Sequence, residues 1–203
     1  MCIRDRYNSK RCDGNFGTKG NSWRSYIDYS GGGMTDWGAH HFGGATFAID
    51  VRELQPNEIL LHEEKAFGTG EPKQWVSLKY PNGRMITHER PGWGNMEVEG
   101  TGGRLKRGKS IENKTGAKRD PKPIPQYKGS GGIYGDFIEC VKTREKPFRD
   151  IELAVNSVMV SHMATIAYNL QRSLKWDEAE QEFKDDPEAN RALDIARREP
   201  WQL

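Results

Sequence analysis

The chain has 203 residues, of which 34% are hydrophobic and 30% charged, and its 31 basic and 29 acidic residues leave a formal net charge of +2. This composition suffices for one domain with its own core and excludes a disordered chain of low hydrophobicity and single-sign charge. The balance of charge also excludes a protein that binds nucleic acid mainly by neutralising phosphates, and no apolar run reaches the roughly 18 residues of a membrane span.

Residues 1–6 read Met-Cys-Ile-Arg-Asp-Arg, which resembles the translation of an adapter used in DNA sequencing libraries. We therefore expect an artefact that packs against nothing, and an upstream domain or export signal lost with the natural start of the chain. The three cysteines, Cys2, Cys12 and Cys140, show no CxxC spacing. A reducing compartment is the simpler interpretation, so the default expectation is a cytoplasmic protein.

A helix is predicted over residues 34–50, directly after three consecutive glycines. Thr35 or Asp36 is suited to cap its first turn. Residues spaced i, i+4, i+8 and i+11 define the face expected to be apolar: Trp37, His41, Ala45 and Ala48.

Residues 59–103 carry the signal of antiparallel strands. Alternating residues lie on both sides of Asn82-Gly83, the strongest short sign of a hairpin, and Gly102-Gly103 predicts a second hairpin. The basic residues that begin at Arg104 alternate, as on the solvent face of a strand. The proline-rich stretch of residues 106–128 is then predicted to be a surface loop.

Helices dominate the rest of the chain. One is predicted over residues 133–146, with Phe137, Cys140 and Val141 on its apolar side, and a final one over residues 186–198, capped by Asp186, after a short strand through Leu174 and Trp176. Between them, residues 150–172 form the clearest helix, with an apolar stripe of Ile151, Val155, Val158, Met159, His162, Ile166 and Leu170. The predicted fold class is α+β, with a large, mostly antiparallel sheet and helices on one face. The other sheet face is expected to be partly free for a partner.

The candidate chemistry lies at Asp36 and His40, which are four residues apart and so share one helix face. An imidazole can accept a proton near neutral pH, and a neighbouring carboxylate can orient it. Two alternatives stay open: Asp36 is only a helix cap, or Asp36, His40 and His41 bind a metal ion. The metal site is disfavoured because adjacent histidines point about 100° apart on a helix.

Two other features are assigned structural roles. His162 lies on an apolar stripe, so a core histidine is expected. The glycine-rich stretch of residues 129–135 precedes a helix, but a dinucleotide-binding turn must follow a buried strand, and a proline-rich segment stands there instead. The sequence therefore contains no cofactor-binding residues of its own, and no metal site is predicted.

Several motifs together resemble the Gfo/Idh/MocA oxidoreductases. Residues 28–41 read DYSGGGMTDWGAHH, in which Asp36 and His40 match the Asp-x-x-x-His helix of that family. Residues 136–144 read DFIECVKTR and, followed by Pro147, are similar to its penultimate helix. The tail resembles the bacterial sugar-dehydrogenase-like branch at Trp176, Asp177, Phe183, Asp186, Glu188, Ala189, Asn190, Arg198, Pro200 and Trp201.

The resemblance implies that residues 7–203 are a C-terminal substrate-binding and oligomerisation domain, and that a missing N-terminal Rossmann domain binds NAD or NADP. Hydride would pass between the nicotinamide and a sugar, cyclitol or related polyol. His40 would accept or donate the proton with support from Asp36, and this fragment alone would be inactive. Contacts with the substrate are expected from Trp37, His41, Tyr29 and Arg24. A homo-oligomer through the sheet face is the expected assembly.

Two other functions are compatible with the same residues. The first is an NAD-dependent glycoside hydrolase of the same superfamily, in which oxidation of one sugar carbon enables elimination of the glycosidic substituent. The second is a non-catalytic binding or assembly module that uses the same sheet.

Overall fold

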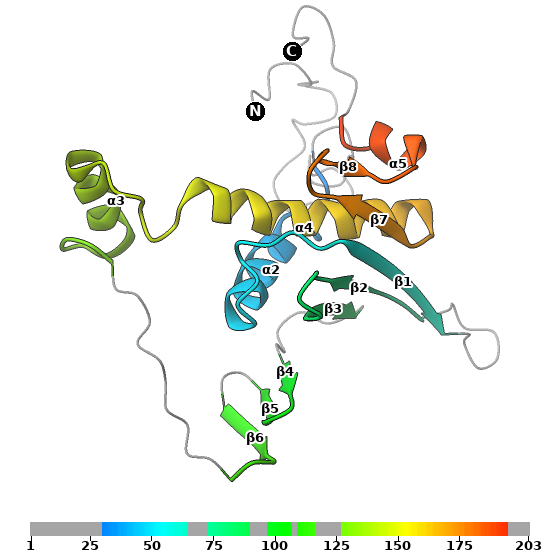
Figure 1. Ribbon diagram of the computed structural model, residues 1–203, viewed down its shortest axis with the longest axis horizontal. Coiled ribbons are helices and arrows are strands. Elements are labelled where there is room, and N and C mark those ends of the chain that lie inside the picture. Colours follow the sequence, from blue (N-terminus) through cyan, green and yellow to red (C-terminus); the bar gives the residue numbers. More distant parts are fainter. Residues whose placement is uncertain (1–29, 65–72, 90–96, 107–108, 117–126, 195–203) are drawn as a thin grey trace, which may run out of the picture. The chain divides into compact units, whose positions relative to one another are not determined.

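The computed structural model describes residues 30–64, 73–89, 97–106, 109–116 and 127–194. Residues 1–6, Arg24 and Tyr29 therefore lie outside the described residues. The chain divides into two compact units, residues 1–92 with 157–203, and residues 93–156. Its elements (Figure 1) are α2 (Trp37–Ala48), β1 (Glu58–Glu64), β2 (Lys73–Lys79), β3 (Met85–Glu89), β4 (Glu97–Gly100), β5 (Gly103–Lys106), β6 (Lys109–Asn113), α3 (Gly132–Thr143), α4 (Ile151–Leu170), β7 (Leu174–Asp177), β8 (Glu182–Phe183) and α5 (Pro187–Arg191).

The first unit is built on a five-stranded sheet in the order β3-β2-β1-β7-β8, and its neighbouring strands pair antiparallel. Strand β7 lies beside β1, with Leu174 opposite Ile59, although the two strands are far apart in the sequence. The second unit carries the antiparallel sheet β4-β5-β6. The predicted α+β fold with a mostly antiparallel sheet is confirmed.

Both predicted hairpins are present. At the first, Gly83 has a φ of +80°, its backbone N–H donates to the carbonyl of Tyr80 at 2.9 Å, and Tyr80 N–H donates to the carbonyl of Arg84 at 2.9 Å. Glycine is favoured there because a left-handed backbone is costly for other residues. At the second hairpin, Gly100 pairs with Gly103.

One face of the five-stranded sheet forms the core with α2 and α4. Alternate strand residues point to this face because successive side chains of a strand project to opposite sides. Figure 1 shows α2 next to α4, and a Cβ added at Gly43 would lie 3.8 Å from Oγ of Ser157 on α4. The core residues of the sheet strands are Ile59, Val76, Leu78, Ile86, Leu174, Trp176 and Phe183.

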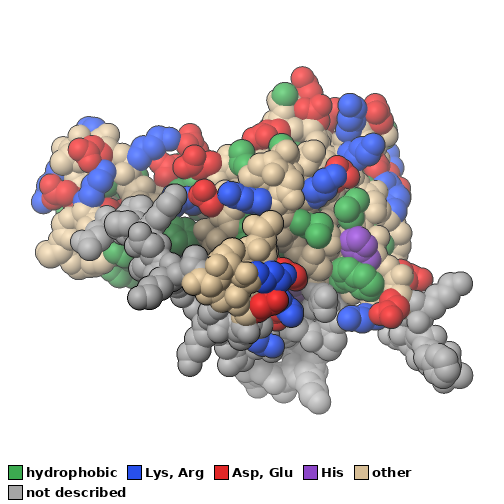
Figure 2. Space-filling view, turned by 60° about the horizontal axis from the view of Figure 1, so that its bottom comes forward, with side chains coloured by type: hydrophobic (Ala, Val, Ile, Leu, Met, Phe, Trp, Pro, Cys, Tyr) green, Lys and Arg blue, Asp and Glu red, His purple; other side chains and the backbone are tan. Residues whose placement is uncertain are grey.

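The strand residues that alternate with this core set lie on the opposite sheet face, which we call the open sheet face: Leu60, His62, Trp75, Ser77, Met85 and Thr87. Of these, Ser77 is itself buried. The ring of His62 stacks on that of Trp75 with centroids 5.2 Å apart. Its Nε2 lies 3.0 Å from Oγ of Ser77, which lies 3.0 Å from Oγ1 of Thr87. Figure 2 shows a face of the molecule on which hydrophobic side chains gather beside a histidine, flanked by charges of both signs.

The helix α2 is confirmed, but its predicted apolar face is wrong except at Ala45, which packs against the core. Its buried residues are Gly38, Phe42 and Thr46, whereas Trp37, His41 and Ala48 are exposed. Apolar residues occur on all sides of this helix, so periodicity could not select the side that meets α4 and the sheet.

The predicted stripe of α4 is also partly wrong. Ile166 is buried, but Ile151 and Val155 are exposed, and His162 is exposed rather than a core residue. The buried side is centred instead on Val160, Ser161, Met163, Ala164, Ile166, Ala167 and Tyr168. The buried residues of this helix begin at Val160, in its second half, which a periodicity taken over its whole length does not reveal.

Three local predictions need correction. On α3, Cys140 is buried as expected, but Phe137 and Val141 are exposed. Part of the predicted loop of residues 106–128 is strand β6, because a bulge between Arg104 and Leu105 lets the chain continue to pair with β5. The last helix, α5, is shorter than predicted, and residues 195–198 of the prediction lie outside the described residues.

Candidate active site

The glycine turn before α2 positions the candidate residues. Gly32 has a φ of +72°, and its N–H donates to Oγ of Ser30 at 3.1 Å. The N–H groups of Thr35 and Asp36 both donate to the carbonyl of Gly32, at 3.2 and 3.1 Å. This compact turn ends at Asp36, which occupies the position directly before the helix.

Asp36 and His40 both lie outside the core. Asp36 is half-buried, and its carboxylate makes no capping hydrogen bond, so the helix-cap interpretation of this side chain is wrong. His40 follows one turn later and is exposed. An exposed imidazole can exchange a proton with a bound hydroxyl, so the geometry is compatible with the predicted chemistry.

The ring of Trp37 lies beside His40 on the exposed side of α2. Trp37 is 62% exposed, and its ring centroid lies 6.0 Å from that of His40. His41 is exposed next to them. The helix and the residue before it therefore carry two of the predicted substrate-binding residues, Trp37 and His41, together with the predicted catalytic residues His40 and Asp36. The other two predicted substrate-binding residues, Tyr29 and Arg24, lie outside the described residues.

Sequence analysis missed two residues of this same side, Gly44 and Phe47, which are both exposed. The guanidinium of Arg52 lies over the ring of Phe47, 5.1 Å from the ring centroid. We call the exposed side the outer face of α2: Trp37, His40, His41, Gly44, Phe47 and Ala48. The predicted spacing i, i+4, i+8 and i+11 from Trp37 included Trp37, His41 and Ala48 of this face, but not Gly44 or Phe47.

The glycine-rich stretch before α3 serves packing within the second unit. A Cβ at Gly135 would lie 1.8 Å from the carbonyl oxygen of Ser130, so the loop can only approach the helix at a glycine. The buried carboxylate of Asp136 accepts hydrogen bonds from the N–H groups of Lys128 and Phe148, at 2.8 and 2.7 Å. These contacts give the glycine-rich stretch a packing role within the second unit.

Within the described parts of the chain, no three or more His, Cys, Asp or Glu side chains are grouped so that they could hold a metal ion. None of the described helices is both long and apolar enough to cross a membrane.

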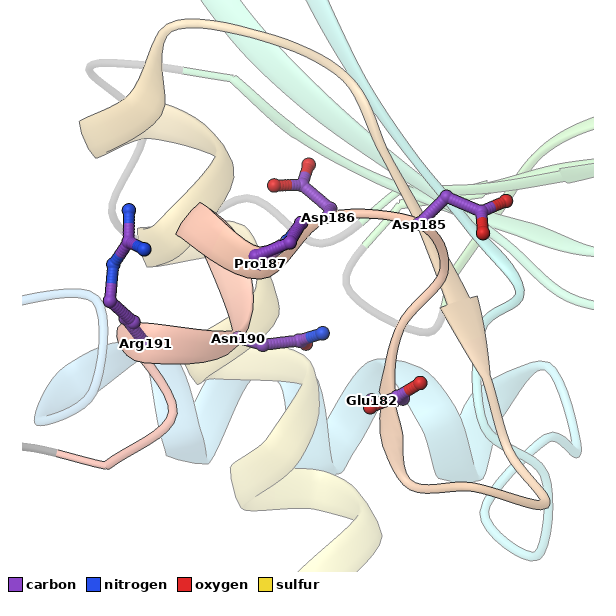
Figure 3. Close-up of a pocket in the computed structure, with 6 residues that line it drawn as sticks. All are labelled: Glu182, Asp185, Asp186, Pro187, Asn190 and Arg191. Atoms are coloured by element: carbon purple, nitrogen blue, oxygen red, sulfur yellow. The ribbon is translucent and has the colours of Figure 1, made fainter.

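A pocket lies at β8 and α5, lined by Glu182, Asp185, Asp186, Pro187, Asn190 and Arg191. Figure 3 shows Asp185 and Asp186 pointing to different sides. Asp186 is bonded to Arg172, which lowers the pKa of its carboxyl to about 2, and it caps α5 through Ala189 N–H at 3.0 Å. Asn190 bonds both backbone groups of Phe183. These polar groups hold the C-terminal elements together, so we assign the pocket a structural role.

Comparison with known proteins gives the family. The family model described as the oxidoreductase family (Gfo/Idh/MocA), C-terminal alpha/beta domain, matches residues 4–203. No curated protein matches the chain. Among solved structures, an NAD-binding protein from Listeria innocua is 14% identical with a TM-score of 0.42, over 76% of this chain and 54% of that one.

A protein described as a probable dehydrogenase from Thermotoga maritima is 21% identical with a TM-score of 0.43, over 75% of this chain and 52% of that chain. The present chain thus spans about half the length of the solved structures that it resembles.

Proposed function

The chain belongs to the Gfo/Idh/MocA oxidoreductase family, as its C-terminal alpha/beta domain, and we propose that it supplies the substrate side of an NAD- or NADP-dependent dehydrogenase acting on a sugar, cyclitol or related polyol. The observation that carries the proposal is the exposed His40, held outside the core on α2 in the Asp-x-x-x-His pattern. The nicotinamide would be bound by a separate nucleotide-binding domain and would accept the hydride.

The part played by this chain is proton transfer and positioning. Oxidation of a hydroxyl removes its proton while hydride leaves the same carbon, so a base must lie about 3 Å from the hydroxyl oxygen. Neutral imidazole of His40 would accept that proton and return it in the reverse direction. Asp36, four residues earlier, would stabilise the imidazolium by its negative charge. Trp37 and His41 would border the bound substrate.

The proposal is tested with the whole protein, expressed from its natural gene together with the coding sequence upstream. We expect reduction of NAD or NADP in the presence of a sugar or polyol from a panel. We expect no micromolar binding of either nucleotide to the 203-residue chain alone, because within the described residues no strand leads through a glycine turn into the N-terminus of a helix, where a pyrophosphate would bind.

Two outcomes would support the alternatives. Nucleotide-dependent cleavage of an aryl glycoside, without net reduction of the nucleotide, would identify the glycoside hydrolase. An upstream sequence without a dinucleotide fingerprint, together with no turnover of any substrate, would contradict the dehydrogenase and favour the non-catalytic module.

The proposed assembly is a homo-oligomer through the open sheet face. Leu60 and Trp75 are half-buried there, and Met85 is 52% exposed. Charges of both signs accompany them, including the Lys79–Glu58 ion pair at 2.8 Å. A second copy of the same face suits this mixture, because a two-fold interface must be complementary to itself.

A further inference from the structure

We infer that Gly44 determines which substrates reach His40, an inference that rests on the function proposed above. Gly44 lies in the middle of the outer face of α2, between His40 and Phe47. It follows His40 by four residues, which is about 6 Å along a helix axis. Residues spaced in this way lie above one another on the same side of the helix.

Packing within the described residues does not require a glycine at this position. A Cβ added at Gly44 would meet no atom of the described residues within 4 Å. The φ angle of Gly44 is not positive, so other residues can adopt its backbone conformation. Glycine inside a helix is nevertheless unfavourable relative to alanine. The helix therefore carries a residue that lowers its stability without any gain in its own packing.

The other glycines of α2 differ in this respect. A Cβ at Gly38 would contact Met34 and Phe42 at 3.5 and 3.6 Å, within the core. A Cβ at Gly43 would face α4, 3.8 Å from Oγ of Ser157. Only at Gly44, among these three, does the missing side chain leave space on the side that carries His40.

The space has a direct use in the proposed reaction. A substrate whose hydroxyl lies at His40 has room for its remaining atoms over the next turn of the helix, at Gly44. A sugar ring can then approach the backbone of α2 between the exposed rings of Trp37 and Phe47. A larger side chain at position 44 would occupy that room and would admit only small polyols.

The test compares Gly44→Ala and Gly44→Leu with the matched control Gly43→Ala on the inner side. Both alanine variants should raise Tm by about 2–4 °C, since each removes a helix glycine without a clash. In the whole enzyme, Gly44→Leu should lower kcat/KM for a hexose by about 10–200-fold, and Gly43→Ala by less than about twofold. Glycerol should be affected far less than the hexose.

The outcomes separate this inference from the proposed function. If the unaltered protein oxidises neither sugars nor polyols, the proposed function itself is contradicted. If it is active but Gly44→Leu keeps its kcat/KM for hexoses, or loses hexose and glycerol turnover equally, the assignment of Gly44 is overturned. Gly44→Ala provides the same comparison should the leucine variant fold poorly, and a lowered Tm of that alanine variant would contradict the open space at this position.

Discussion

The buried carboxylate of Asp136 accepts a hydrogen bond from the backbone N–H of Phe148 at 2.7 Å, across the end of α3. Its second oxygen accepts from the N–H of Lys128 at 2.8 Å. One side chain therefore joins the segments before and after the helix. Asp136 is also the first residue of the motif that resembles the family at this helix. Its two hydrogen bonds explain why an aspartate suits that position.

Replacing Asp136 with Ala should loosen this part of the chain. The two amide groups would lose their acceptor, at a cost of roughly 1–3 kcal/mol for each one that stays buried. Urea denaturation and hydrogen exchange at the Lys128 and Phe148 amides measure the effect. Glu139→Ala on the same helix is the control, because its exposed ion pair with Lys142 contributes at most about 1 kcal/mol. Unchanged exchange in the Asp136 variant would contradict the role of this carboxylate.

The orientation of α2 is tested by its two phenylalanines. Phe42 is 2% exposed and Phe47 is 44% exposed. Phe42→Ala should lower the free energy of unfolding by about 3–5 kcal/mol through lost burial and cavity formation. Phe47→Ala should cost no more than about 1 kcal/mol, mainly through its contact with Arg52. Urea denaturation measures the free energy of unfolding of both variants. Equal losses of stability would show that the outer face is buried against the rest of the chain.

The ion pair of Asp186 with Arg172 should make the free energy of unfolding depend on pH in the acidic range. The Arg172 hydrogen bond, followed by that of Ala189 N–H, lowers the pKa of Asp186 from 3.8 to about 2. Because the native pKa lies below the unfolded value, the contribution is complete above about pH 5 and is lost as the pH falls toward 2.

Denaturant midpoints measured from pH 2 to pH 5 should fall less steeply for Asp186→Asn than for the unaltered protein, because the variant has no carboxyl to protonate at this position. Glu182→Gln serves as the control for removing an acidic group from the same pocket. Parallel curves for Asp186→Asn and the unaltered chain would show that Asp186 has an ordinary pKa.

His40→Ala in the whole enzyme should lower kcat by about 10²–10⁴-fold, the usual contribution of a general acid or base. Stability should change by less than about 0.5 kcal/mol, since the side chain is exposed. The control is His162→Ala, at an exposed histidine on α4, which should leave both kcat and the free energy of unfolding unaltered. Near-normal turnover of the His40 variant would remove the catalytic assignment.

The proposed homo-oligomer predicts a specific effect of charge on the open sheet face. Leu60→Glu would place a carboxylate in the interface, where an unpaired buried charge is strongly disfavoured. Analytical ultracentrifugation should then show dissociation. Leu193→Glu, at an exposed leucine outside the sheet strands, should leave the assembly intact. A monomeric unaltered protein would contradict the proposed assembly.

The sequence by itself determined the features that depend on neighbouring residues. Asn82-Gly83 predicted its hairpin because the left-handed glycine acts within the turn itself. Asp186 was recognised as a cap because its partner, Ala189 N–H, lies only three residues away. The Asp36 and His40 pair was found in the same way, as a short motif on one helix, and the family followed from several such motifs in order.

Only the tertiary structure decided which sides of the helices are buried and which strands meet. Residues 37–48 carry apolar side chains on more than one side of the helix, so burial of Phe42 rather than Trp37 depends on where α4 and the sheet lie. The same holds for His162, which is exposed although Ile166 of the same predicted stripe is buried, and for Leu174, which pairs with Ile59 from a distant part of the chain. Burial is a property of the assembled layers, and a local pattern specifies it only when one side of an element is clearly polar.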